Sequence, residues 1–380
     1  MFRDRYPLVL ANASHDGSDT LDVLDKATGE RLTGVALADP ALVQAAIGHA
    51  VEAREALASW PAHRRREVLE HVVDRLLERG ETFAHVLALE AGKPIDLARG
   101  EVARAVETFR LAAEECSRLG GDFTPLDGSP LGEGYSAITR RVPVGVASFI
   151  TPFNFPLNLV AHKVAPALAA GCPFVLKPAS RTPVSALLLG DVLLETDLPA
   201  RSVPLLPCAR RDADAFSSDP RLALLSFTGS PDVGWELKAR AGRARVVLEL
   251  GGNAACVVDE TADLDRAAER ISYGAFAQAG QSCISVQRVF AVASVADALR
   301  ERLVQRAAAV PRGHPLESGT WLGPLISEGE AERVEAWIAE AVEAGARVLV
   351  GGERQGAFLE PTWVEGVPHE ARLSAREVFG

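Results

Sequence analysis

From residue 143 to residue 250 the chain alternates short apolar runs with helical patterns, and this alternation limits the folds that it can adopt. The apolar runs are strand candidates at residues 144–150, 173–176, 203–206, 222–227 and 246–248. The helical patterns between them cover residues 157–170, 183–195 and 232–241. Strands joined through helices form right-handed crossovers and a buried parallel sheet. The sequence therefore predicts an α/β fold in which ligands bind at the carboxyl ends of the strands.

The residues before this unit are predicted to form short strands up to residue 38 and then a layer of helices. Asp39 followed by Pro40 is a helix start, because aspartate can cap the helix and proline fits its first position. Three or four helices are expected up to about residue 119. In the last of them, Val102, Val106 and Phe109 fall on one face at helical spacing, so this face is predicted to be buried.

Residues 120–142 are rich in glycine and proline and end in an alternating run, which predicts a hairpin that bridges domains or lies at an edge. After residue 253 the strand candidates are residues 254–258, 286–292 and 347–350. The helical patterns there cover residues 264–278, 295–309 and 328–344. A second α/β unit is therefore predicted, and a length of 380 residues also favours two domains.

Composition excludes several function classes. The net charge of −11 disfavours binding to nucleic acid or to anionic membranes, because both need a basic surface. Five cysteines lie far apart with no CxxC pair, which indicates reduced thiols and a cytoplasmic setting, with neither a disulfide framework nor a metal site. Neither a signal peptide nor a membrane-spanning run of about 18 apolar residues is expected.

Cys283 lies among small and polar residues, directly after Gly280, Gln281 and Ser282. A structural buried thiol lies more often among aliphatic residues. Two interpretations of this stretch remain open: a catalytic nucleophile, or a small core residue, since free cysteine is among the most buried residue types.

Polar residues follow two of the predicted strands closely. Asn154 lies between two prolines after the 144–150 run, and it is either an amide donor or a turn residue. Lys177 ends the next run, where it could bind ribose hydroxyls or a phosphate, or simply be solvated.

Two further loops carry polar groups at strand ends. Gly229 and Ser230 open a helix, where free N–H groups bind anions, although Ser230 is equally well explained as a plain helix cap. Glu249 precedes Gly251 and Gly252, which allow close approach, and it is either a base or a salt-bridged carboxylate. No GxGxxG fingerprint follows any strand.

Taken together, these stretches resemble the aldehyde dehydrogenase superfamily from about residue 20 to the last residue. The motifs occur in the order TPFNFP, KPAS, FTGS, ELGG, FxxxGQxC and EVFG. Glu249 and Cys283 are 34 residues apart, and Asn154 and Lys177 are 23 apart, as in that family. Residues 134–163 are similar to the lactaldehyde and non-phosphorylating glyceraldehyde-3-phosphate dehydrogenase branches, which suggests a small hydroxy- or phospho-aldehyde substrate.

The resemblance implies a role for each matching residue. Cys283 would be the nucleophile, Glu249 the general base, and the Asn154 amide would form the oxyanion hole with the Cys283 backbone N–H. The cofactor, NAD or NADP, would be held by Thr151, Pro152, Lys177, Ser180, Gly229, Ser230, Glu377 and Phe379. Within this set Lys177 would hold the adenosine ribose, Ser230 the pyrophosphate and Glu377 the nicotinamide ribose, with Phe379 near the ring.

The family also implies a domain plan. Residues 1–122 and 143–250 would form a Rossmann-type NAD(P)-binding domain, and residues 251–380 a second α/β catalytic domain. Residues 123–142 would be an oligomerisation hairpin, so a homodimer or homotetramer is expected for an intact chain. Family members continue past EVFG, where this chain ends, so we expect an incomplete catalytic domain.

Three functions follow from the resemblance. The first is oxidation of an aldehyde to a carboxylic acid with NAD(P)+, through a cysteine thiohemiacetal and a thioester. The alternative is a shortened, catalytically impaired relative that only binds nucleotide or a partner. A third, acyl transfer to coenzyme A or ester hydrolysis, is disfavoured because thiolysis would not need Glu249 to activate water.

The cofactor loops depart from the family pattern at residues 203–211, which lack glycine and carry Cys208, Arg210 and Arg211. Ser180 stands where many NAD-preferring relatives carry a glutamate that repels a 2′-phosphate. Because arginine pairs well with phosphate, we expect NADP to be tolerated.

Overall fold

Four parallel strands form the central sheet in the computed structural model, which describes residues 2–17 and 19–380. They are β8 (Val146–Ile150), β9 (Phe174–Lys177), β10 (Leu222–Gly229) and β11 (Arg245–Leu250). Their order is β11-β10-β8-β9, and every neighbouring pair is parallel. The prediction of a parallel sheet built from these runs is confirmed.

The strand predicted at residues 203–206 is the exception. This segment makes single bridges from Leu205 to Leu176 and Val9, and it forms no continuous ladder. Pro204 and Pro207 have no N–H to donate, although both of their carbonyls accept backbone hydrogen bonds, so the segment pairs only at isolated bridges.

Side chains of the sheet alternate between two helical layers. Ala147 and Phe149 of β8 belong to the core of α2 to α6, whereas Val146 belongs to the core of α1. The helices on these faces are α1 (Pro40–Ala58), α2 (Ala62–Glu78), α3 (Gly80–Ala91), α4 (Ile95–Glu115), α5 (Asn158–Ala169), α6 (Val184–Leu194), α7 (Ala215–Ser218) and α8 (Pro231–Arg240). Successive side chains of a strand point to opposite faces of the sheet, so neighbouring residues of one strand pack against different helical layers.

The helix predictions before residue 120 are confirmed. Asp39 caps α1 by accepting a hydrogen bond from the Leu42 N–H at 2.8 Å. Val102, Val106 and Phe109 of α4 are all buried, as their spacing predicted.

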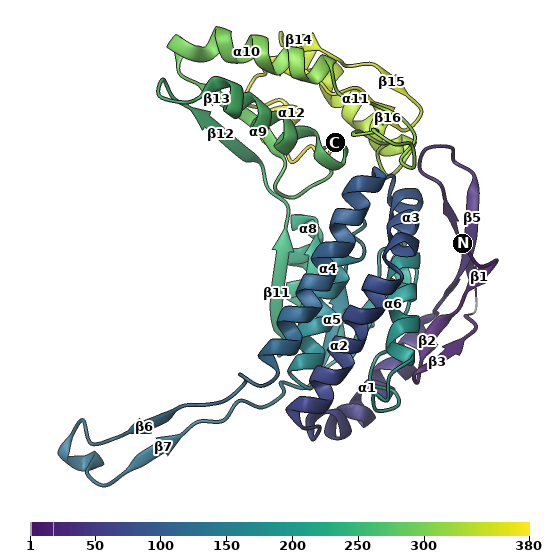
Figure 1. The fold of residues 1–380 in the computed structure, drawn as a ribbon, viewed down its shortest axis with the longest axis vertical. Helices are drawn as coiled ribbons and strands as arrows, with labels where there is room; N and C mark the ends of the chain where they lie inside the picture. Colours follow the sequence, from purple (N-terminus) through teal and green to yellow (C-terminus); the bar gives the residue numbers. More distant parts are fainter. Residues whose placement is uncertain (1, 18) are drawn as a thin grey trace.

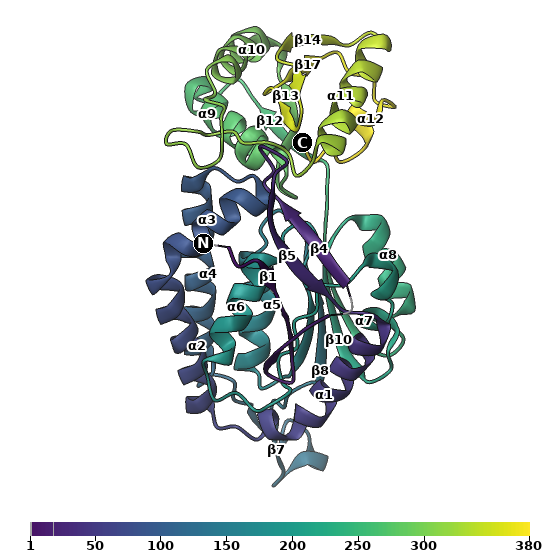
Figure 2. The same ribbon diagram turned by 90° about the vertical axis from the view of Figure 1, so that its right-hand side faces the viewer.

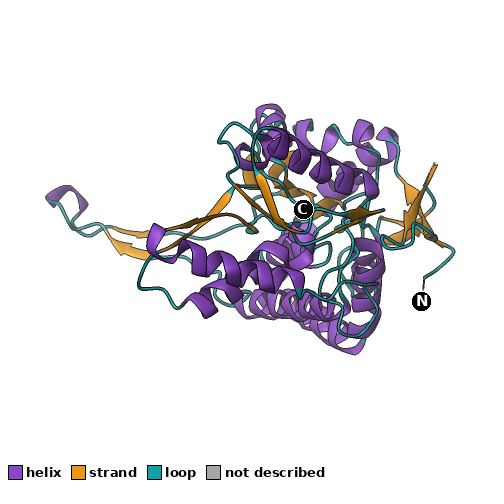
Figure 3. Ribbon diagram, turned by 90° about the horizontal axis from the view of Figure 1, so that it is seen from above, coloured by secondary structure: helices purple, strands orange, loops and turns teal. Residues whose placement is uncertain are grey.

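Short strands precede α1, and the predicted hairpin follows α4. The N-terminal strands are β1 (Arg5–Tyr6), β2 (Leu8–Leu10), β3 (Ala13–His15), β4 (Asp19–Leu24) and β5 (Arg31–Leu37). In the hairpin, β6 (Phe123–Pro125) pairs antiparallel with β7 (Ser136–Ile138), with a 3₁₀ turn at Pro130–Gly132. This β6–β7 arm extends away from the rest of the molecule (Figures 1 and 3).

Residues 254–380 form an upper lobe, which stands above the parallel-sheet lobe and holds the C-terminus near the junction (Figures 1 and 2). Its strands are β12 (Ala254–Val258), β13 (Val286–Ala291), β14 (Arg347–Val350), β15 (Arg354–Gln355), β16 (Phe358–Leu359) and β17 (Trp363–Glu365). Its helices are α9 (Leu264–Phe276), α10 (Ala293–Ala308), α11 (Glu328–Glu343) and α12 (Arg372–Ala375). The sequence predicted the parallel β12 and β13 but not β15 to β17.

The predicted end of α9 at residue 278 is wrong, because the helix stops at Phe276. A kinked 3₁₀ segment follows, in which Gln278 and Ala279 have φ of 60° and 52° and so leave the right-handed helix. Among the described residues no helix is long and apolar enough to cross a membrane.

Candidate active site

The strand ends bring the predicted site residues to one edge of the sheet. Glu249 of β11 is the register partner of Thr228 in β10, and Lys177 of β9 is the partner of Ile150 in β8. Phe227, next to Thr228, pairs with Ile150, so these positions form one line across the four strands. Parallel strands end at a common edge, and this edge therefore collects the groups that the sequence pointed to.

Polar groups with unused capacity for hydrogen bonds or ion pairs lie at the β8 and β9 end of this edge. The Thr151 hydroxyl is buried and has no hydrogen-bond partner among the residues that the structure describes. Burial lowers the pKa of the Lys177 amine, and no carboxylate of the described chain forms an ion pair with it. Ser180 donates from its hydroxyl to the Cys208 carbonyl at 3.5 Å, which joins the two loops. A ligand rich in hydroxyl or phosphate oxygens would satisfy these donors.

The start of α8 lies at the β10 end. Ser230 takes the cap position with extended backbone, but its hydroxyl makes no capping hydrogen bond. Gly229 is required for packing, since a Cβ there would lie 2.5 Å from the Phe227 ring. The first N–H groups of α8 therefore remain available to an anion.

Cys283 lies in an exposed turn after the kinked segment Ala277–Gly280, whereas Cys116, Cys172 and Cys208 are buried. The interpretation of Cys283 as a small core residue is therefore wrong. Two non-glycine residues just before it, Gln278 and Ala279, adopt left-handed backbone conformations. Such residues cost on the order of 1–3 kcal/mol each and cluster at functional sites.

The surroundings of Cys283 disfavour its thiolate form. Its pKa is raised by partial burial first, and then by the negative charges of Glu377 and Glu249. A helix start at Cys283, which would have lowered the pKa, does not occur, because the residue lies in a turn. A thiolate at neutral pH therefore requires a base or a nearby positive charge.

Glu377 and Phe379 tie the end of the chain to this edge. The Glu377 carboxylate accepts a hydrogen bond from the Gly252 N–H at 3.2 Å, and burial raises its pKa. A Cβ at Gly251 would overlap this carboxylate, which explains the glycine. The Phe379 ring meets the Phe153 ring edge to face, with 5.8 Å between the centroids.

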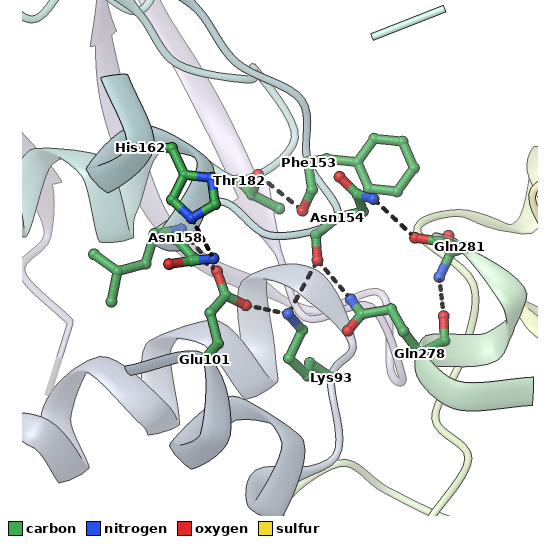
Figure 4. A network of polar contacts seen from close by, with 10 residues as sticks. Lys93, Glu101, Phe153, Asn154, Asn158, His162, Thr182, Gln278 and Gln281 are labelled. Carbon is green, nitrogen blue, oxygen red and sulfur yellow. Dashed lines mark hydrogen bonds and ion pairs between the residues drawn. The ribbon is translucent and has the colours of Figure 1, made fainter. Parts of the chain in front are cut away.

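Asn154 connects the two lobes (Figure 4). Its side-chain amide donates to the Gln281 carbonyl at 3.0 Å. Its backbone carbonyl accepts from Lys93 Nζ at 3.0 Å and from Gln278 Nε2 at 2.8 Å. The Asn154 side chain is buried and its Oδ1 atom has no partner, so the residue is anchored through its backbone and one amide hydrogen.

Sequence reasoning missed Lys163, a buried lysine on α5. Its Nζ donates to the Ser226 and Thr228 hydroxyls at 2.8 and 2.9 Å, and burial lowers its pKa to about 8. The charge of Glu249 acts in the opposite direction, which brings Lys163 into the same electrostatic environment. A charged residue inside an otherwise apolar helix was the available signal.

Arg104 was also missed. Its guanidinium carbon lies 5.7 Å from the centre of the Phe155 ring, one residue beyond Asn154. The pKa of His162 is lowered by burial and then by the charges of Arg104 and Lys163. Across residues 2–17 and 19–380 no carboxylate forms an ion pair with Arg104, so the exposed guanidinium near the Phe155 ring has no counter-charge.

Comparison with known proteins identifies the family. A family model described as "Aldehyde dehydrogenase family" matches residues 13–380. The chain belongs to the aldehyde dehydrogenase family. A 3-sulfolactaldehyde dehydrogenase of Priestia aryabhattai is 40% identical over 99% of this chain and 79% of its own length. An Escherichia coli succinate-semialdehyde dehydrogenase, named for NADP(+), is 36% identical over 96% of this chain and 76% of its own length.

Solved structures share the fold. Aldehyde dehydrogenase 21 from Physcomitrella patens, in complex with the reaction product succinate, has a TM-score of 0.97 at 47% identity and covers 100% of this chain and 80% of its own. Betaine aldehyde dehydrogenase from Staphylococcus aureus, in complex with NAD+, has a TM-score of 0.94 at 26% identity, covering 98% and 76%. The predicted aldehyde-dehydrogenase fold is confirmed.

Members of this family oxidise aldehydes to carboxylic acids with a nicotinamide cofactor, and this protein is an oxidoreductase of that class. The residues at the strand ends fit a dinucleotide. They offer a buried hydroxyl without a partner at Thr151, an amine without a carboxylate at Lys177, and the open start of α8.

Replacing Glu249 with glutamine is expected to lower the pKa of the Cys283 thiol, because a negative charge that disfavours the thiolate is removed. Iodoacetamide reacts with thiolates, so the pH profile of Cys283 alkylation, followed by peptide mass spectrometry, reports this pKa. The midpoint should move to lower pH in E249Q and E377Q. It should stay in place in Glu269→Gln, which removes an exposed carboxylate from α9; an unmoved midpoint in E249Q would contradict the expectation.

Proposed function

We propose that this dehydrogenase oxidises a short aldehyde that carries a second acidic group, with Cys283, Glu249 and Asn154 in the reacting centre. The observation that carries the catalytic assignment is the position of Cys283, whose thiol is exposed just after the left-handed residues Gln278 and Ala279 and within electrostatic reach of two carboxylates. Both Glu249 and Glu377 contribute to the raised pKa of Cys283, so both carboxylates act on the one exposed thiol of the chain's described residues.

Cys283 attacks the aldehyde carbon as a thiolate, and the carbonyl oxygen becomes the oxyanion of a tetrahedral thiohemiacetal. Asn154 uses one amide hydrogen on Gln281, which leaves the second for this oxyanion, beside the Cys283 N–H. One such donor contributes roughly 3–4 kcal/mol to lowering the barrier. When bound at the strand ends, the nicotinamide would supply the acceptor for the hydride that leaves the thiohemiacetal carbon, and Cys283 would then carry the acyl group as a thioester. Glu249 then removes a proton from the water that attacks the thioester and releases the acid.

The substrate class rests on Arg104 together with the relatives. The printed names of relatives include dehydrogenases of 3-sulfolactaldehyde and of succinate, aspartate and glutarate semialdehydes, and each of these substrates has an acidic group beyond the aldehyde. Arg104 supplies an unpaired cation near the Phe155 ring, one residue along the chain from Asn154, where such a group would be neutralised. A carboxylate or sulfonate at the far end of the aldehyde would thus face Arg104.

Either NAD or NADP serves as the cofactor in this proposal. Arg210 and Arg211 are exposed on the loop that Ser180 contacts through the Cys208 carbonyl, close to the ribose-binding position proposed for Lys177. Arg211 has Asp212 at 3.7 Å, whereas the described residues include no carboxylate paired with Arg210. Pro152 and Phe379 would line the remaining length of the cofactor, and Gly229 with Ser230 would receive its pyrophosphate.

The domain plan and the assembly are also proposals. Residues 1–122 and 143–250 would bind the cofactor and residues 251–380 would carry the catalytic loop, which the separate hydrophobic cores of the two lobes support. Residues 123–142 would contact a second copy of the chain. The arm exposes Leu131 and Ile138 by 94% and 80%, and apolar surface of this kind is usually covered by a partner. The free cysteines support a cytoplasmic setting.

Pre-steady-state kinetics distinguishes the proposed role of Cys283 as nucleophile from that of Glu249 as base. Cys283→Ala should abolish the aldehyde-dependent formation of reduced nicotinamide. Glu249→Gln should keep a single-turnover burst but lower steady-state turnover by about 10²–10⁴, because only thioester hydrolysis loses its base. Cys256→Ala, at the half-buried thiol of β12, is the matched control and should retain activity. No activity in the folded wild-type chain would leave only nucleotide or partner binding.

Arg104→Met should raise KM for succinate semialdehyde by about 10–100-fold, the loss expected for one charge-assisted hydrogen bond. Butyraldehyde, which lacks the second acid, should be oxidised with unchanged kinetics. Arg110→Met, which removes an exposed arginine paired with Glu107 on the same helix, is the control. An equal increase in KM for both aldehydes in R104M would refute the proposal that Arg104 recognises the second acidic group.

NADP should support turnover, and Arg210→Ala should raise KM for NADP by about tenfold while KM for NAD stays unchanged. The reason is that only NADP carries the 2′-phosphate that the guanidinium would contact. Steady-state kinetics with each cofactor at saturating aldehyde measures both values. The absence of turnover with NADP at millimolar concentration would refute the proposal.

A further inference from the structure

A buried ion pair lies beneath the site and contacts neither the proposed cofactor position nor the thiol. Lys93, between α3 and α4, pairs with Glu101 on α4, and the two side chains are 0% and 1% exposed. Removing two charges from water costs several kcal/mol per ion, so such a pair is weak evidence for added stability. Its hydrogen bonds indicate what else it does.

The carboxylate of the pair fixes the start of α5. Glu101 Oε1 accepts the backbone N–H groups of Leu157 and Asn158, each at 3.0 Å. These N–H groups have no partner inside the helix, so Glu101 acts as a remote cap from a different helix. α5 also carries Lys163, which contacts Ser226 and Thr228 at the catalytic edge.

The amine of the pair fixes the loop just before α5. Lys93 Nζ donates to the Asn154 carbonyl at 3.0 Å and lies 4.2 Å from the centre of the Phe155 ring. Glu101 and Lys93 therefore bind the two ends of the same five-residue segment, 154–158. With Glu101, the Asn154 carbonyl and the ring, the amine has partners on several sides.

The Asn154 carbonyl also accepts a hydrogen bond from the upper lobe. Gln278 Nε2 donates to it at 2.8 Å, while Gln281 Nε2 donates to the Gln278 carbonyl at 3.2 Å. Gln281 Oε1 accepts from the Ile326 N–H at 2.9 Å, which ties the loop before Cys283 to the rest of that lobe. Figure 4 shows the hydrogen bonds from Lys93 and Gln278 meeting at the Asn154 carbonyl.

We propose that Lys93 and Glu101 are positioning residues for the oxyanion donor: they clamp the Asn154 backbone so that its amide stays aligned with the Cys283 loop. This inference rests on the proposed role of Asn154. The clamp acts in the transition state and not on ground-state binding, because the oxyanion exists only after attack. A donor displaced by about 1 Å costs roughly 10²-fold in rate.

The double variant Lys93→Met/Glu101→Gln tests this without leaving a buried charge unpaired. We expect kcat to fall by about 10–100-fold, with little change in KM for the aldehyde or in the dissociation constant of the cofactor. Urea unfolding monitors stability separately. The control is Arg99→Met/Glu81→Gln, which removes an exposed ion pair between the same two helices and should leave kcat unchanged.

A combined variant distinguishes the clamp from a failure of the proposed function. Asn154→Ala alone should lower kcat by about 10²–10³. Adding Lys93→Met/Glu101→Gln to Asn154→Ala should then lower kcat little further, because the donor that the pair aligns is already gone. Full additivity, or normal kcat in the folded double variant, would overturn the clamp while leaving Asn154 in its role. Normal kcat in Asn154→Ala would overturn both.

Discussion

The site depends on the common carboxyl edge of four parallel strands. Register places Glu249, Thr228, Ile150 and Lys177 in adjacent positions across β11, β10, β8 and β9. None of these residues is near another in sequence, and each alone has an ordinary structural explanation. Parallel pairing brings them into one row at the edge of the sheet. The thiol of Cys283 comes from the upper lobe.

The loop that leads to Cys283 has a strained backbone. Gln278 and Ala279 are left-handed, and Gly280 continues the turn with φ of 70°. This strain costs on the order of 1–3 kcal/mol for each non-glycine residue. Hydrogen bonds to residues of the candidate site stabilise the strained conformation. Gln278 donates to the Asn154 carbonyl from the strained conformation itself. The loop before Cys283 and Asn154, the proposed oxyanion donor, are therefore fixed by one network.

The sequence predicted what depends on local pattern and missed what depends on distant contacts. The strand runs, the Asp39 cap and the apolar face of α4 follow from periodicity and local chemistry, and they were predicted correctly. The run at residues 203–206 forms isolated bridges and no regular strand, because Pro204 and Pro207 lack the N–H groups of a continuous ladder. Lys93 and Glu101 lie in a stretch of ordinary polar composition, and their burial becomes visible only when α4 packs against α5.

Charges of opposite sign act on different residues of the candidate site. Glu249 and Glu377 act on Cys283, whereas Arg104 of α4 and Lys163 of α5 act on His162. A doubly functional aldehyde anion would be repelled by the carboxylates and attracted by Arg104. Its aldehyde end then faces Cys283 with the acid pointing away from Glu249. The carboxylates that add to the effect of burial in raising the pKa of Cys283 would thus also orient the proposed anionic substrate for attack.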